Sequence, residues 1–219
     1  MVMLTASWTA QANVVLSEGF DDITTLAAAG WSFVNNSSPP GTTGFFQGNS
    51  AVFGSQAGAD DSYIAANFLN ADFGGTISNW LISPTLSLSN RLELTFFTRG
   101  DVGAIADRLE IRLSLNGDST DVGNTIDSVG DFSTLLTTIN PVLDPMGYPT
   151  DWTKFTAVFS GISDGTLGRF AFRYTVPDTS INGNYIGIDS VTANVPEPST
   201  IALFGLALSL GLLAVRRRA

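Results

Sequence analysis

The sequence predicts an all-β protein, a jelly-roll-like antiparallel β-sandwich followed by a short C-terminal transmembrane helix. Three observations support this fold class. Apolar and polar residues alternate with a period of two through most of the chain, as in strands that bury one face. Glycine, proline and asparagine separate these stretches at short intervals, as in the turns of a sandwich. Before the C-terminal segment, one short stretch alone has a helical pattern.

About ten strands follow one another along the chain. The clearest spans residues 109–115, where Leu109 and Ile111 alternate with Glu110 and Arg112. The other predicted strands are residues 14–16, 31–34, 51–53, 63–66, 80–83, 92–98, 154–159, 169–176 and 185–191. In residues 169–176 the odd-numbered side chains, Arg173 among them, are expected to face out.

Two kinds of segment lie between these strands. The helix candidate begins at Asp21 or Asp22 as N-cap and ends at Gly30. Residues 35–48 and 117–152 have the composition of long loops. Because long loops in a compact domain are usually functional or mobile, either one could form a binding edge.

The composition excludes several classes of enzyme and partner. With 219 residues, 44% of them hydrophobic, the chain can form one sizeable core. It has no cysteine, so no disulfide supports the fold, and no histidine, which excludes Ser-His-Asp and Cys-His catalysis and most zinc sites. The excess of 20 acidic over 10 basic residues makes nucleic acid a poor partner. Sixteen of the acids are aspartates, which favour turns and, on an extracellular surface, also suit calcium.

The last 25 residues combine three features in order. These are the tripeptide Pro196, Glu197 and Pro198, an uncharged apolar run at residues 201–215, and the cluster Arg216, Arg217 and Arg218. As a helix the apolar run would be about 22 Å long, shorter than the roughly 30 Å hydrocarbon core of a bilayer. The arginines should stay cytoplasmic, with everything before them outside. Taken without a family likeness, a plain C-terminal membrane anchor explains these features equally well.

This order of features resembles the PEP-CTERM sorting signal of Gram-negative bacteria, in which the Pro-Glu-Pro tripeptide is the signature. The resemblance implies recognition by exosortase, a membrane enzyme that cuts near the tripeptide. It also implies transit through the inner membrane, with residues 201–215 inserted and the C-terminus cytoplasmic, before delivery to the cell envelope or extracellular matrix. It covers residues 195–219 and gives no information about the activity of residues 1–194.

The N-terminus has the pattern of a shortened export signal. Residues 1–12 are mildly apolar and end in Ala10-Gln11-Ala12, a small-x-small pattern of the kind signal peptidase cuts, but the positively charged start is missing. An ordinary N-terminal strand is the alternative. The expected organisation is therefore a signal-peptide remnant at 1–12, a β-sandwich domain at 13–194 and a sorting segment at 195–219.

A second resemblance covers about residues 14–193. It rests on seven short motifs together with Trp152: SEGF at 17–20, GW at 30–31, YIAANF at 63–68, SNWLISP at 78–84, LELTF at 92–96, FAFRY at 170–174 and IGIDSV at 186–191. Together they resemble the choice-of-anchor J domain of surface-anchored bacterial proteins, a relative of cleaved-adhesin and MAM-type jelly rolls. The resemblance implies a β-sandwich module with no catalytic activity of its own.

Relatives of that domain often hold a structural calcium between the first and last strands, and the resemblance maps its ligands to Glu18 and Asp189. Calcium takes oxygen ligands, and two carboxylates brought together without a cation would repel each other. Ser190 stands where a second aspartate is common, which removes one charged ligand. The alternative is that Glu18 and Asp189 are separate acids at strand ends.

Catalytic patterns are weak, and we predict no enzyme and no catalytic residue. Residues 161–165 match G-x-S-x-G by letter, but they lie between strands and have no histidine partner. Residues 116–121 are rich in oxygen ligands but lack the closing glutamate of a calcium loop. Paired carboxylates could make a hydrolase, yet Glu93 and Glu110 alternate with core residues and are expected to be solvated surface charges.

Two hypotheses about function remain. The leading one is an exported, surface- or matrix-associated structural or adhesive module. The alternative is a carbohydrate-binding module that holds extracellular polysaccharide through the aromatics Phe45, Phe46, Trp80 and Trp152. Trp80 and Trp152 fit core positions at least as well as exposed ones.

Overall fold

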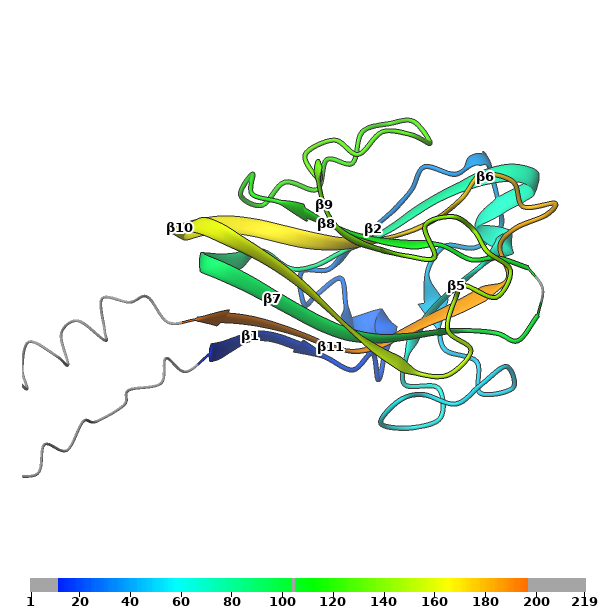
Figure 1. Ribbon diagram of the computed structural model, residues 1–219, viewed down its shortest axis with the longest axis horizontal. Coiled ribbons are helices and arrows are strands. Elements are labelled where there is room, and N and C mark those ends of the chain that lie inside the picture. Colours follow the sequence, from blue (N-terminus) through cyan, green and yellow to red (C-terminus); the bar gives the residue numbers. More distant parts are fainter. Residues whose placement is uncertain (1–11, 104, 197–219) are drawn as a thin grey trace, which may run out of the picture.

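The computed structural model describes residues 12–103 and 105–196. In this part of the chain the protein is an antiparallel β-sandwich with two layers, as the sequence predicts (Figure 1). The strands are β1 (Ala12–Glu18), β2 (Ser32–Asn35), β3 (Ser38–Pro40), β4 (Phe46–Gln47), β5 (Ile64–Asn67), β6 (Ala71–Ile82), β7 (Leu86–Gly100), β8 (Leu109–Ser114), β9 (Thr134–Ile139), β10 (Thr153–Val176) and β11 (Tyr185–Pro196). Two 3₁₀ turns, η1 (Ile23–Thr25) and η2 (Phe68–Asn70), complete the elements.

Strand β10 belongs to both layers. Its first part, up to Gly168, pairs with β7, and its last part, from Arg169 onward, lies between β6 and β8. The first layer continues from β7 to β11, whose free edge is shared by β1 and β5, and β5 in turn pairs with β4. In the second layer β2 and β3 pair with β6, and β9 pairs with β8. The long strand therefore joins the two layers covalently.

The crossing point of β10 is closely packed. A Cβ atom on Gly168 would lie 2.5 Å from the Ser114 carbonyl oxygen, so only glycine fits there. Next to it Ser83 and Phe170 are joined by two hydrogen bonds, since Ser83 N donates to Phe170 O and the Ser83 side-chain hydroxyl accepts from Phe170 N. These contacts hold the β6–β7 connection against the bend in β10.

The main core fills the space between the layers. Leu94 and Phe96 of β7, Ile111 of β8 and Phe172 of β10 are fully buried there, which follows from the alternation in these strands. Burying a side chain of this size stabilises the fold by about 1.5–3 kcal/mol. Because the chain has no cysteine, this burial and the strand hydrogen bonds hold the sandwich together.

The outer face of the second layer is covered too, which the alternation did not predict. Ala171 and Arg173, expected to face out, are 0% and 6% exposed. The segment between β8 and β9 folds over them, and its Phe132 packs against Trp80 in a second, smaller core. Local periodicity reports which face a side chain is on, but it cannot report what lies over that face.

Four predicted segments differ from the structure. Residues 51–53 form a turn because the Asn49 side chain accepts a hydrogen bond from Ala51 N and the Asn49 carbonyl accepts one from Val52 N. The helix candidate is only the short 3₁₀ turn η1, whose N-cap Asp22 accepts from Thr24 N as expected. The two predicted loops contain the short strands β3, β4 and β9, because tertiary pairing with β6, β5 and β8 orders segments that have weak local patterns.

A buried carboxyl, Asp107, fixes the segment between β7 and β8. It is 2% exposed, and its Oδ1 accepts hydrogen bonds from the Tyr174 hydroxyl at 2.6 Å and from Asn184 N at 2.7 Å. Burial raises the pKa of Asp107 to about 6, although the Tyr174 hydrogen bond opposes the shift.

The raised pKa of Asp107 gives a pH-dependent stability. In the folded chain the carboxyl binds its proton more tightly than in the unfolded chain, so its contribution is fully present below about pH 4 and is lost as pH rises through about 6. Asp107→Asn keeps an oxygen that can accept both hydrogen bonds and removes the buried charge. We expect this variant to gain stability relative to wild type as pH rises from 4 to 7, by up to about 3 kcal/mol. Urea unfolding across this range measures the difference, and a difference that does not change with pH would contradict the assignment.

Candidate functional site

The two residues that the resemblance maps to a calcium site lie on neighbouring strands. Glu18 ends β1 and is paired with Val191 of β11, two residues beyond Asp189. The structure therefore brings both residues to the same strand pair, at the edge of the first layer (Figure 1).

Asp189 anchors the loop that precedes β5. Its carboxylate is completely buried, and Oδ2 accepts hydrogen bonds from Gln56 N at 2.8 Å and Ala57 N at 3.1 Å. The other oxygen, Oδ1, accepts from Ser190, which has a left-handed backbone (φ 50°). Burial raises the pKa of Asp189, and the main-chain donors of Ala57 and Gln56 partly oppose that shift. Sequence reasoning could not identify Gln56 and Ala57 as partners, because main-chain donors have no residue signature.

Glu18 has a similar local role. Its Oε1 accepts a hydrogen bond from Phe20 N at 2.7 Å, where the backbone is again left-handed (φ 55°). Gln47 joins the same turn to the loop before β5, since its Nε2 donates to Phe20 O and to Asp61 O. No group of three or more acidic side chains with metal-binding spacing occurs among residues 12–103 and 105–196. A calcium ion between Glu18 and Asp189 would therefore draw its remaining ligands from carbonyl, amide or water oxygens.

The residues of the sorting signal lie almost entirely beyond the described part of the chain. Pro196 is the last residue of β11 and is paired with Ala12, the first residue of β1. Glu197, Pro198 and Arg216, Arg217 and Arg218, with the apolar run at 201–215, fall outside it. Within the described residues, no helix has the length and apolar character needed to cross a bilayer.

The G-x-S-x-G match is an irregular stretch within β10. Gly161 and Gly165 have positive φ angles of 83° and 75°, and the strand pairs with β7 on both sides of them. A nucleophile elbow needs a strand followed by a helix, so this geometry does not form one.

Glu110 is not the solvated charge that the sequence suggested. Its Oε2 lies 2.8 Å from Arg112 Nε and 3.2 Å from an Arg173 guanidinium nitrogen, and its side chain is 14% exposed. Burial by itself would raise the pKa of Glu110, but the two guanidinium groups lower it below its usual value. The Arg173 guanidinium also lies over the Trp80 ring, 5.0 Å from its centroid. Glu93, in contrast, pairs with Arg91 on an exposed surface.

The four aromatics proposed from the sequence as sugar platforms are all packed against other side chains. Trp80 is fully buried. Trp152 donates from Nε1 to Gly54 O and packs edge-on against Phe53, and Phe46 packs edge-on against Tyr185. Phe45 contacts the main core. Trp80 is thus closed to a ligand, whereas Phe45, Phe46 and Trp152 are partly buried.

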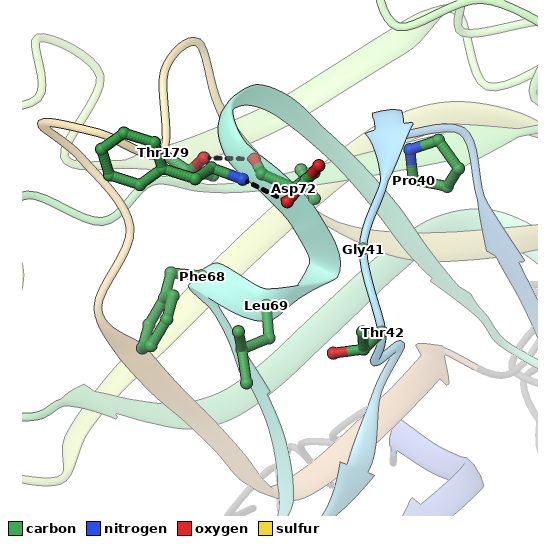
Figure 2. Close-up of a pocket in the computed structure, with 9 residues that line it drawn as sticks. Pro40, Gly41, Thr42, Phe68, Leu69, Asp72 and Thr179 are labelled. Atoms are coloured by element: carbon green, nitrogen blue, oxygen red, sulfur yellow. Dashed lines mark hydrogen bonds between the residues drawn. The ribbon is translucent and has the colours of Figure 1, made fainter.

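A different aromatic surface lies at the start of β6. A hollow of about 330 Å³, which we call the β6 hollow, is bordered by Phe68 and Leu69 of η2, by residues 71–73 of β6, by residues 40–42 and by Thr179. Figure 2 shows Phe68 and Leu69 across from Asp72, with Pro40, Gly41 and Thr42 along a further side. The Phe73 side chain is 82% exposed, and those of Phe68 and Leu69 are 45% and 41% exposed. Sequence alternation missed this surface because Phe73 lies in an irregular part of its strand.

Comparison with known proteins identifies the C-terminal segment and the fold. The family model of the PEP-CTERM protein-sorting motif matches residues 194–218, which implies export, transient membrane anchoring and processing by the membrane enzyme exosortase. No curated protein matches the chain.

Among solved structures, the chain is similar to the K1 and K3 cleaved adhesin domains of Lys-gingipain from Porphyromonas gingivalis. They are 21% and 19% identical, both with a TM-score of 0.53. The alignments cover 82% and 84% of this chain and 97% and 99% of those domains. This similarity confirms the sandwich fold, and membership of the choice-of-anchor J family remains a prediction.

The contrast between Glu110 and Glu93 predicts different costs for the same substitution. Glu110→Ala leaves Arg173 buried without its opposite charge and should destabilise the fold by about 3 kcal/mol. Glu93→Ala removes an exposed pair with Arg91 and should cost less than about 1 kcal/mol. Urea unfolding of both variants measures the two costs, and equal values would contradict the buried ion pair.

Proposed function

We propose that the chain is an exported, non-enzymatic structural or adhesive module that reaches the cell envelope or extracellular matrix of a Gram-negative bacterium. The observation that carries this proposal is the PEP-CTERM match at residues 194–218. It overlaps the end of β11, so the sorting signal follows the sandwich with no intervening linker. The motifs shared with choice-of-anchor J domains support assigning the sandwich to that family of surface modules.

The sorting route follows from the chemistry of the C-terminal segment. Residues 201–215 would insert into the inner membrane, and Arg216, Arg217 and Arg218 would hold the C-terminus in the cytoplasm. The Pro196-Glu197-Pro198 tripeptide would then lie outside, where exosortase reads it. Proline fixes φ and disfavours helix at the preceding residue, so the tripeptide should present an extended, accessible backbone to that enzyme.

A carbohydrate-binding module is the second candidate function. The observation that favours it is the β6 hollow, where aromatic rings are exposed beside polar groups. The acidic charge of the chain argues against nucleic acid as a partner.

We also propose that Glu18 and Asp189 hold one structural calcium ion. Both carboxylates lie on the β1–β11 pair, and Glu18 Oε2 has no protein partner among the described residues. With two acidic ligands, such a site should have the modest affinity of extracellular calcium modules, with a dissociation constant of about 0.1–1 mM. Its role would be to hold the first and last strands together.

The sorting route predicts a defined processing product. In the native host, the intact mass of the wild-type protein should correspond to a chain that ends near the tripeptide. This processed protein should appear outside the inner membrane. Glu197→Ala should keep its full C-terminal mass and remain in the inner-membrane fraction. Intact mass spectrometry of each cell fraction makes the measurement.

Glu93→Ala is the matched control, because it removes an exposed glutamate from the folded domain. It should be processed like wild type. If wild type and Glu197→Ala both retain their arginines in the membrane, the segment is only an anchor and the sorting proposal is wrong.

The calcium proposal predicts a metal-dependent stability. If 5 mM Ca²⁺ is roughly fifty times the dissociation constant, it should raise the Tm of the wild-type sandwich by about 5 °C relative to EDTA. Glu18→Gln keeps an oxygen that can accept the Phe20 hydrogen bond but loses the charge, so the increase should largely disappear. Glu93→Gln is the control and should keep the full increase. A wild-type Tm that is the same in Ca²⁺ and EDTA would end the calcium proposal and leave Asp189 as a loop anchor.

A further inference from the structure

The β6 hollow owes its most exposed side chain to a bulge in the sheet. Opposite the short strand β3, the pairing jumps from Ser38–Thr76 to Pro40–Ala71, so residues 72–75 of β6 are looped out of the ladder. Gly74 has a positive φ of 76°, which allows the bulge to turn. The bulge carries Phe73 at 82% exposure.

Hydrogen bonds from the segment after β10 hold this bulge in place. The Thr179 hydroxyl donates to Asp72 O at 2.6 Å and accepts from Gly75 N at 3.1 Å, and Thr179 N donates to Gly75 O at 2.9 Å. The Thr76 hydroxyl donates to Pro177 O at 2.7 Å. These contacts fix the backbone on either side of Phe73. The Phe73 ring is therefore carried on an ordered backbone while it remains exposed to solvent.

The polar groups of the hollow are those that recognise hydroxyls. Asp72 Oδ1 accepts from Phe73 N, whereas Asp72 Oδ2 and the exposed Thr42 hydroxyl have no protein partner among the described residues. A carboxylate oxygen is a strong acceptor, and a threonine hydroxyl can donate or accept. Figure 2 shows Asp72 and Thr42 from different segments around the space that Phe68 and Leu69 border.

A second hollow extends the same surface. It is polar, about 540 Å³ in volume, and lined by residues 35–38, by Pro40 and by residues 124–126, including Asn35, Asn36 and Asn124. Pro40 lines both hollows, so the aromatic and the amide-rich surfaces adjoin. A ligand made of several linked units would be long enough to contact both hollows.

Position and charge narrow the choice of ligand. β1 begins and β11 ends at one end of the sandwich, whereas η2, the start of β6 and the segment between β10 and β11 lie toward the other (Figure 1). The hollow therefore faces away from the end at which the sorting motif begins. The chain has a net charge of −10, and Asp72 adds a carboxylate to the hollow, so an anionic ligand or a second copy of this acidic chain would be repelled.

We propose that the β6 hollow binds one sugar unit of an uncharged polysaccharide. The apolar C–H face of the sugar ring stacks on Phe73, and its hydroxyls bond to Asp72 Oδ2 and the Thr42 hydroxyl. Adjoining sugar units of the same chain extend over Pro40 toward the asparagine-rich hollow. This inference rests on the proposed function in one respect, since delivery to the matrix is what brings the module to a polysaccharide.

Affinity gel electrophoresis of the purified full chain tests the proposal. The gels contain dextran, xylan, galactan or galactomannan as uncharged polymers, or alginate as an anionic one. Wild type should be retarded by at least one uncharged polymer and not by alginate. Phe73→Ala should lose about tenfold or more in affinity, because the ring no longer buries its face on binding. Asp72→Asn should weaken the retardation less than Phe73→Ala does.

Val142→Ala is the matched control, because Val142 is 81% exposed in a different loop and its variant should bind like wild type. An unchanged Tm for Phe73→Ala shows that the loss is not caused by unfolding. No retardation of wild type by any uncharged polymer, or equal retardation of Phe73→Ala, overturns the proposal. So does a concentration-dependent dimer in sedimentation that Phe73→Ala abolishes, because the surface then serves a second copy. A chain that is sorted and processed normally but shows no retardation overturns the binding proposal alone.

Discussion

The structure depends on one strand that belongs to both layers of the sandwich. β10 leaves the first layer at Gly168 and enters the second at Arg169, and the connected strands β6 and β7 follow it on the other side. No side chain fits at Gly168, since the Ser114 carbonyl occupies the space of a Cβ atom. Because the backbone itself joins the layers, their spacing and relative direction follow from this crossing. The core side chains of β7, β8 and β10 then meet between them.

Covering the second layer has a consequence for where ligands can bind. The segment between β8 and β9 closes over Trp80 and Arg173, and Glu110 neutralises the arginine that this segment buries. The broad face of the sheet is therefore unavailable to a partner in this region. Open surfaces include the margins of the sandwich, where β6 bulges and the loops meet. An irregularity in the sheet, rather than its regular face, displays the most exposed aromatic ring of the described residues.

The first and last described residues and the two acids near them share the β1–β11 strand pair. Asp189 holds the loop before β5 through Oδ2 and accepts from Ser190 N through Oδ1, and Glu18 holds the turn after β1. These hydrogen bonds order the margin of the sheet. The sorting motif begins within the last residues of β11, so the folded module and its sorting signal are contiguous in sequence. The similarity to cleaved adhesin domains supports the fold of the sandwich, and the C-terminal match identifies the sorting signal.

The amino-acid sequence alone determined the fold class, the main-core faces of β7, β8 and β10, and the sorting motif. Period-two alternation and a contiguous motif are local properties, so they can be recognised without the tertiary structure. It could not predict the cover over Ala171 and Arg173, the ion pair of Glu110 or the main-chain donors around Asp189, because residues distant in sequence supply the partners. It could not predict the exposure of the aromatic rings either. Trp80 and Phe46 pack against neighbours that only the fold brings close, while Phe73 is exposed because pairing with β3 loops residues 72–75 out of the ladder. Tertiary pairing decided which aromatic rings face solvent, since exposure depends on what the rest of the chain covers.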